Sequence, residues 1–61
     1  MSNYITMESF GSMCPRNWEE IADALNAIID ERGILHDDDA CDALWEEFCS
    51  GNLEGVPEAI G

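Results

Sequence analysis

The apolar residues between positions 18 and 32 restrict the fold more than any other feature of the chain, because they recur at intervals of three and four. They are Trp18, Ile21, Ala22, Leu25, Ile28 and Ile29. This spacing places them on one face of an α-helix and predicts a core-facing stripe that includes Trp18. Asn17 is a favoured N-cap, and Glu20 three positions later can complete a capping box. Gly33 can end the helix in the left-handed conformation.

A second amphipathic helix is predicted over residues 38–50. Its inner stripe consists of Cys41, Leu44, Trp45 and Phe48. Asp37 is a good N-cap, the aspartates that follow it complement the positive end of the helix dipole, and Gly51 can end the helix. Only four residues, 33–36, separate the two helices. The helices should therefore be antiparallel or steeply crossed neighbours.

The first residues allow two interpretations. Thr6 can cap a short helix from Met7 to about Ser12, with Ile5 and Phe10 in contact as a hydrophobic staple. Residues 3–9 could instead form a strand, because several of them favour β-structure. A lone strand would have no partner within this chain, so we expect the short helix.

Together these elements predict an all-α fold. We expect a single acidic domain over residues 1–61, in which a short N-terminal helix precedes a hairpin of two amphipathic helices and an irregular tail covers about 52–61. So short a chain buries a small core, which a homodimer would enlarge. The N-terminus lacks the pattern of a secretory leader, and no segment approaches the ~18 apolar residues of a membrane span. Three cysteines, an odd number, argue against a secreted disulfide scaffold. We expect a cytoplasmic protein.

The charge of the chain is strongly one-sided. Fourteen residues are Asp or Glu and only Arg16 and Arg32 are basic, so the formal net charge is -12. Most of the acids fall on the outer faces of the two predicted helices and on the linker between them, where they should form one continuous negative surface. These predicted partner-binding residues are Glu19, Glu20, Asp23, Asp30, Glu31, Asp37, Asp38, Asp39, Asp42, Glu46 and Glu47.

Several of these acids repel one another. Asp42 is four positions from both Asp38 and Glu46, and Glu19 is four positions from Asp23. Like charges at this spacing destabilise a helix, so the pattern brings no local gain. Solubility is one explanation, but a small domain needs a net charge of no more than about 8 for that purpose. A basic binding partner is the other explanation, and we prefer it.

Basic grooves commonly bind nucleic acid. Carboxylates on successive helical turns recur every ~5–6 Å, a spacing close to that of phosphates along one DNA strand. In size, charge and the two acid-faced helices, the chain resembles the small acidic proteins of phages and mobile elements that inhibit host defence by DNA mimicry, such as anti-CRISPR and antirestriction proteins. The resemblance rests on no shared motif. It implies a bacterial host cell and a target that is a CRISPR effector or a restriction enzyme.

No pattern indicates catalysis. His36 is the only histidine, and neither Cys14 nor Cys41 has the surroundings of a nucleophile that such a histidine could activate. A zinc site built from these three residues and Cys49 lacks a CxxC pair. The run of aspartates at 37–39 lacks the glycine and the spacing of a calcium loop. From these three observations together we expect no metal, no cofactor and no enzyme activity.

The sequence therefore predicts a non-catalytic inhibitor that mimics DNA and blocks the nucleic-acid-binding site of a basic host-defence protein, with an anti-CRISPR protein as the first choice. It should contact neither nucleic acid directly nor a membrane. The alternative is a small interaction or regulatory module that binds through an apolar patch. Trp18 and Trp45 are expected in the core, and either one, if exposed, would be an anchor for a partner.

Overall fold

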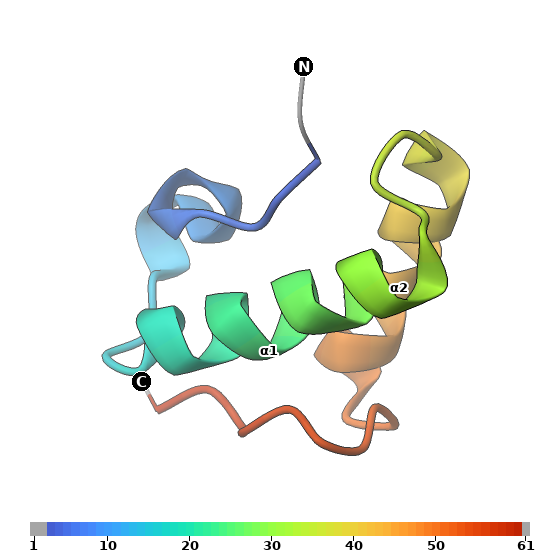
Figure 1. Ribbon diagram of the computed structural model, residues 1–61. Helices are drawn as coiled ribbons and strands as arrows, with labels where there is room; N and C mark the ends of the chain where they lie inside the picture. Colours follow the sequence, from blue (N-terminus) through green and yellow to red (C-terminus); the bar gives the residue numbers. More distant parts are fainter. Residues whose placement is uncertain (1–2, 61) are drawn as a thin grey trace.

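The computed structural model describes residues 3–60 and confirms the predicted all-α fold. A short 3-10 helix, η1 (Met7–Met13), precedes two α-helices, α1 (Trp18–Arg32) and α2 (Asp38–Ser50) (Figure 1). No strand occurs among the described residues, and residues 3–6, which the strand alternative required, run into η1 without pairing. No helix in that part of the chain has the length and apolar character needed to cross a lipid bilayer.

Helix α1 has the predicted bounds and the predicted C-terminus. Gly33 adopts the left-handed conformation with φ 65°, and its N–H donates to the carbonyl of Asp30 at 3.2 Å. The N–H of Ile34 donates to the carbonyl of Ile29 at 3.2 Å, which completes a Schellman ending. Residues beyond the helix therefore turn back toward the core, where Ile34 packs.

The predicted capping box at the start of α1 is wrong. Asn17 stands at the N-cap position, but its side chain caps no helix N–H. Its Nδ2 instead donates to the carbonyl of Glu58 at 2.7 Å, and its Oδ1 accepts from the N–H of Ile60 at 3.0 Å. The C-terminal tail returns to this point, since the N–H of Arg16 donates to the carbonyl of Ile60 at 2.9 Å (Figure 1). An amide group can satisfy a backbone donor and a backbone acceptor together, and that arrangement takes the place of the cap.

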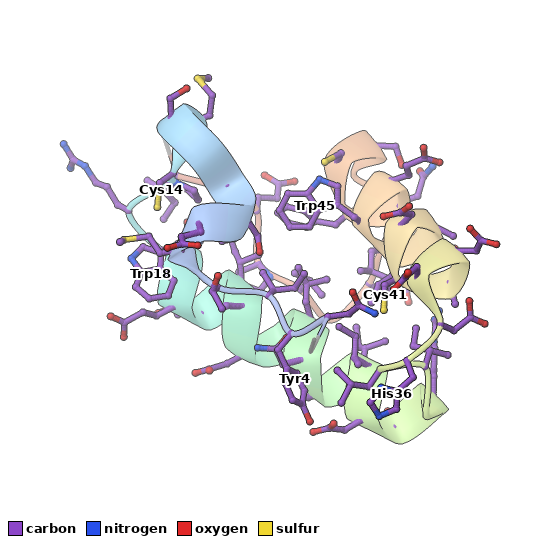
Figure 2. The ribbon with its side chains drawn as sticks, turned by 90° about the horizontal axis from the view of Figure 1, so that it is seen from above. Tyr4, Cys14, Trp18, His36, Cys41 and Trp45 are labelled. Carbon is purple, nitrogen blue, oxygen red and sulfur yellow. The ribbon has the colours of Figure 1, made fainter. Side chains whose placement is uncertain are left out.

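Helix α2 begins and ends as predicted. Asp37 is its N-cap, and its Oδ1 accepts from the N–H of Ala40 at 3.1 Å. Gly51 ends the helix with φ 79°, and the N–H of Asn52 donates to the carbonyl of Glu47 at 3.2 Å. Of the two arrangements that the short linker allows, the structure has the steep crossing: α2 runs across one end of α1 rather than alongside it (Figures 1 and 2).

The N-terminal helix lies where the sequence predicts it but is a 3-10 helix. The N–H of Ser9 donates to the carbonyl of Thr6 at 3.0 Å, and the N–H of Thr6 donates to Ser9 Oγ at 3.1 Å. Gly11 interrupts the helical dihedral angles with φ 61°. A conformation in this region is favourable for glycine alone, so the turn changes direction here.

The core is built around four side chains that are almost fully buried, namely Ile21, Leu25, Ile29 and Leu44. Phe10 from η1, Trp45 and Phe48 from α2, and Leu53 and Val56 from the tail pack around them. The ring centroid of Trp45 lies 5.3 Å from that of Phe10 and 5.5 Å from that of Phe48. Trp45 is thus a core residue, as predicted.

Trp18 departs from the prediction. It is half-buried and is not among the residues that pack against the core cluster. It stands at the end of α1 far from α2, whereas Trp45 faces the middle of the molecule (Figure 2). Trp18 is on the apolar stripe but lies outside the core cluster that Ile21, Leu25 and Ile29 form with Leu44.

Candidate acidic surface and groove

The eleven predicted partner-binding residues are all exposed. They are supplied by the two α-helices and by the residue that caps α2. Helix α1 carries Glu19, Glu20, Asp23, Asp30 and Glu31; Asp37 is the cap; and α2 carries Asp38, Asp39, Asp42, Glu46 and Glu47. The outward position of each follows from the helical spacing, because the buried stripe occupies the opposite face of each helix.

The steep crossing decides which of these acids lie together. The outward faces of α1 and α2 point to different sides of the molecule (Figures 1 and 2). The acids of the two helices adjoin at the corner where α1 ends and α2 begins, because the neighbouring residues Asn3 and Tyr4 bind Asp38 and Asp30 respectively. Glu19, Glu20 and Asp23 lie toward the other end of α1. The negative surface therefore bends around the corner instead of lying in one plane.

Two side chains of the N-terminal segment bind carboxylates at this corner. Tyr4 Oη donates to Oδ1 of Asp30 at 2.7 Å. Asn3 Nδ2 donates to Oδ1 of Asp38 at 2.8 Å and to the carbonyl of Leu35 at 2.7 Å. The hydrogen bond to Asp30 raises the pKa of Tyr4, with smaller contributions from burial and from the charge of Asp30. Sequence reasoning missed both residues, because hydrogen bonds between residues 26 to 35 positions apart leave no periodic pattern.

The basic residues do not neutralise the acidic surface. Arg16 and Arg32 are both exposed. Within residues 3–60 neither arginine forms an ion pair with a carboxylate. The carboxylates thus accept hydrogen bonds from neutral groups alone in this part of the structure, and the surface keeps its negative charge. Such a surface attracts a basic partner over a distance set by the ionic strength.

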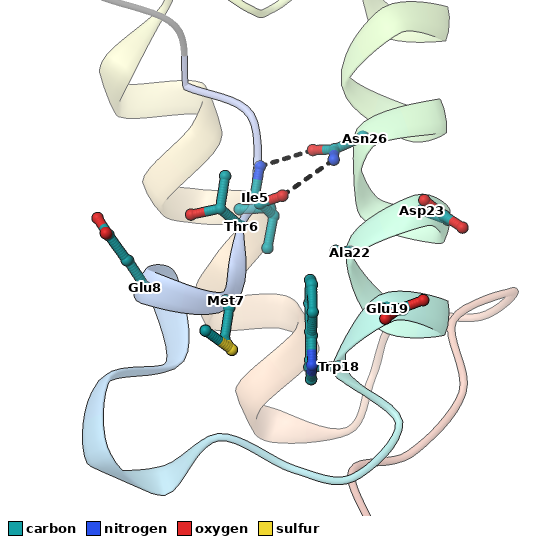
Figure 3. A pocket seen from close by; sticks show the side chains of 9 residues that line it. All are labelled: Ile5, Thr6, Met7, Glu8, Trp18, Glu19, Ala22, Asp23 and Asn26. Atoms are coloured by element: carbon teal, nitrogen blue, oxygen red, sulfur yellow. Dashed lines mark hydrogen bonds between the residues drawn. The ribbon is translucent and has the colours of Figure 1, made fainter.

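An open groove of about 670 Å³ lies between the N-terminal segment and the first turns of α1 (Figure 3). Ile5, Met7, Trp18 and Ala22 supply its apolar part, and Met7 is 52% exposed. Carboxylates stand on both sides of it: Glu8 on the N-terminal segment, and Glu19 and Asp23 on α1 (Figure 3). None of the described lining residues is basic.

Asn26 fixes one wall of the groove. Its Oδ1 accepts from the N–H of Ile5 at 2.6 Å, and its Nδ2 donates to the carbonyl of Ile5 at 3.1 Å (Figure 3). The two bonds hold the extended segment before η1 at a set distance from α1. An asparagine in the middle of a helix is a signal that sequence analysis can use, because its side chain competes with helical hydrogen bonds and often has a tertiary partner.

The groups considered as metal ligands are dispersed. Among the described residues, no group of three or more His, Cys, Asp or Glu side chains is placed to hold a metal ion. Cys14 and Cys49 are exposed, and Cys41 is half-buried with its thiol directed to the carbonyl of Ile34 at 3.2 Å. Burial raises the pKa of the Cys41 thiol, and the nearby aspartates, Asp37 first, raise it further.

Comparisons with known proteins give no information on the acidic surface or the groove. Searches against protein-family models, curated proteins and solved structures found no match for this chain. What can be said of its function therefore rests on the two features just described, which are an uncompensated acidic surface and an acid-rimmed apolar groove.

Proposed function

We propose that this protein is a non-catalytic inhibitor that mimics DNA with its acidic surface and blocks the nucleic-acid-binding site of a host-defence complex. An anti-CRISPR protein that acts on a CRISPR effector is the first choice, and a restriction enzyme is the second target. The observation that supports the proposal is the exposure of all eleven predicted carboxylates on α1, α2 and their linker, with no arginine paired to them among residues 3–60.

The spacing of the acids supports this role. Carboxylates on successive helical turns recur every ~5–6 Å on a rigid framework, so they resemble a row of phosphates rather than a flexible acidic tail. The bend at the corner between α1 and α2 presents two such rows at an angle to each other. In this role the protein would act in the cytoplasm of a bacterial host cell and would touch neither nucleic acid nor membrane.

The test is displacement of a labelled DNA duplex from purified, guide-loaded CRISPR effectors and from restriction enzymes. The double reversal Asp42→Lys/Glu46→Lys should weaken displacement at least about 100-fold, since it replaces attraction by repulsion at two adjacent turns. The single change Asp42→Ala should weaken it about threefold or less. The matched control is Glu54→Lys/Glu58→Lys, which changes the net charge equally on two exposed acids outside the predicted surface.

Two outcomes would contradict the proposal. One is that the protein displaces DNA from none of these enzymes at low salt. The other is that both double reversals act equally, which would leave a net-charge effect and no specific surface. Affinity for the target should also fall steeply as salt rises, because exposed charges are screened.

The groove favours the alternative function, a small interaction module that binds through an apolar patch. Trp18 lines the groove instead of the core, and Met7 exposes half of its surface there. Binding through an apolar patch would be nearly indifferent to salt. Salt dependence of target binding therefore separates binding through charges from a purely apolar contact.

A further inference from the structure

The groove beside Trp18 is a partly apolar surface that the fold does not use. Its apolar lining consists of Ile5, Met7, Trp18 and Ala22, of which Ala22 is buried and Met7 is mainly exposed. Tryptophan is the residue type most enriched among the anchors of protein interfaces. The indole stands between Met7 and the start of α1, where it lines the groove (Figure 3).

The rim of the groove selects the charge of its occupant. Glu8 lines the groove from η1 and Glu19 and Asp23 line it from α1, and none of the described lining residues is basic (Figure 3). A second copy of this chain bound in the groove would place its own acidic side chains against these three carboxylates. Each chain also carries a net charge of -12. Juxtaposed like charges oppose association, so a cationic occupant is favoured and a homodimer through this face is not.

We propose that the groove binds an arginine side chain, presented by a basic segment of a protein partner. The apolar lining suits the methylene stem, the indole of Trp18 suits the flat face of a guanidinium, and the rim carboxylates accept its forked N–H donors. Lysine fits less well because its ammonium group is strongly hydrated and cannot stack. The inference rests on the proposed function, to which it adds the contact that anchors the basic partner.

The site is held open before any partner arrives. The two hydrogen bonds between the Asn26 side chain and the backbone of Ile5, at 2.6 and 3.1 Å, fix the wall opposite Trp18. The bonds between Thr6 and Ser9 at 3.0 and 3.1 Å fix the turn that carries Met7 and Glu8. A binding site whose walls are already ordered loses less conformational entropy on binding, which raises its affinity.

The first experiment titrates the ¹⁵N-labelled protein with a blocked five-residue peptide in which leucine and arginine alternate. The indole N–H signals of Trp18 and Trp45 are followed by NMR, and Trp45, in the core, is the internal control. We expect the Trp18 signal to shift and saturate while the Trp45 signal does not. A peptide with lysine in place of arginine should bind about fivefold more weakly. Equal affinity of the two peptides, or shifts centred on α2, would overturn the proposal.

The second experiment compares two sets of neutral substitutions with the same change in net charge. Glu8→Gln/Glu19→Gln/Asp23→Asn removes the rim, and Asp39→Asn/Asp42→Asn/Glu46→Gln removes three acids of α2. The rim variant should lose at least about tenfold in affinity for the arginine peptide, and the α2 variant about threefold or less. Equal losses in the two variants would mean general attraction and no anchor site.

Trp18 is tested by two variants, so that a folding defect cannot obscure the result. Trp18→Ala should lower the affinity about tenfold, and Trp18→Phe, which keeps an aromatic face, about threefold. Circular dichroism reports whether each variant keeps its helices. The indole would have no role in binding if two results were obtained together. The folded Trp18→Phe protein would bind the arginine peptide as tightly as the parent does, and the unfolded fraction of Trp18→Ala would account for all of its loss of affinity.

The two proposals fail in different ways. If mimicry is right and the groove is not an anchor, Trp18→Phe will displace DNA from the target as the parent does, while Asp42→Lys/Glu46→Lys will not. If the groove is an anchor and mimicry is wrong, the arginine peptide will shift the Trp18 signal although no DNA is displaced from any enzyme.

Discussion

Trp18 and Trp45 both lie on the apolar stripe of a helix, but their surroundings in the folded protein differ. Trp45 packs between Phe10 and Phe48 at centroid distances of 5.3 and 5.5 Å. Trp18 lines an open groove at the far end of α1 (Figures 2 and 3). Helical spacing states which face of a helix is apolar, but it does not state how far along that face the neighbouring elements reach.

The two helix starts differ in the same way. Asp37 caps its own helix by accepting from the N–H of Ala40. Asn17 occupies the same position on α1, but its side chain binds the backbone of the C-terminal tail at Glu58 and Ile60. The start of α2 is therefore capped by a contact within its own first turn, whereas the start of α1 is held by contacts with a distant part of the chain.

The largest difference in stability should be seen when the two tryptophans are truncated one at a time. Trp45→Ala should lower the free energy of unfolding by about 3 kcal/mol, because it leaves a cavity among packed aromatic rings. Trp18→Ala should lower it by less than about 1 kcal/mol, since its ring lies outside the core. Urea unfolding followed by circular dichroism measures both. Equal losses would show that Trp18 supports the core after all.

The helix starts should give the next largest effect. Asp37→Ala should cost about 1 kcal/mol through loss of the cap. Asn17→Ala should cost about as much through loss of two hydrogen bonds to the tail, and the amide of Ile60 should exchange faster with deuterium. The control is Asn17→Asp, because aspartate caps helices well but cannot donate to the carbonyl of Glu58. Full recovery of stability in Asn17→Asp would mean that Asn17 acts as a cap.

How much of the molecule is predictable from sequence follows from this contrast. Some features depend only on residues within one helical turn, and the prediction of each is confirmed. They are the bounds of α1 and α2, the cap at Asp37 and the left-handed glycines at 33 and 51. The exposure of the acidic side chains follows from helical periodicity in the same way. The groove depends on Asn26 holding Ile5, 21 positions earlier in the chain, and no local pattern determines such a pairing.

Salt should stabilise the folded chain. The three like-charged pairs at i,i+4 on α1 and α2 each cost about 0.3 kcal/mol at low ionic strength, which amounts to roughly 0.9 kcal/mol together. Raising the salt from about 0.01 to 0.15 M shortens the screening length from roughly 30 to 8 Å and should recover most of that. Thermal unfolding at several sodium chloride concentrations measures the change. A fall in stability on adding salt would indicate that favourable ion pairs outweigh the repulsion.

The smallest effect concerns Tyr4 at the corner between the helices. Its hydrogen bond to Asp30 raises its pKa above the usual value of about 10. A pKa that is higher in the folded than in the unfolded chain means that the contribution to stability is complete below pH ~10 and is lost as pH rises through the folded value. Tyr4 is the only tyrosine, so its ionisation is followed directly by ultraviolet absorbance.

Asp30→Asn separates the cause of this shift from the general negative charge of the protein. The variant removes the accepting carboxylate and lowers the net charge magnitude by one out of 12. If the hydrogen bond dominates, the titration midpoint of Tyr4 should fall most of the way to its ordinary value. The matched change Asp23→Asn, on the same helix but beside the groove, should leave the midpoint nearly unchanged. Equal shifts in the two variants would mean that long-range repulsion sets the pKa of Tyr4. The hydrogen bond of 2.7 Å between Tyr4 and Asp30 would then contribute little to the pKa shift.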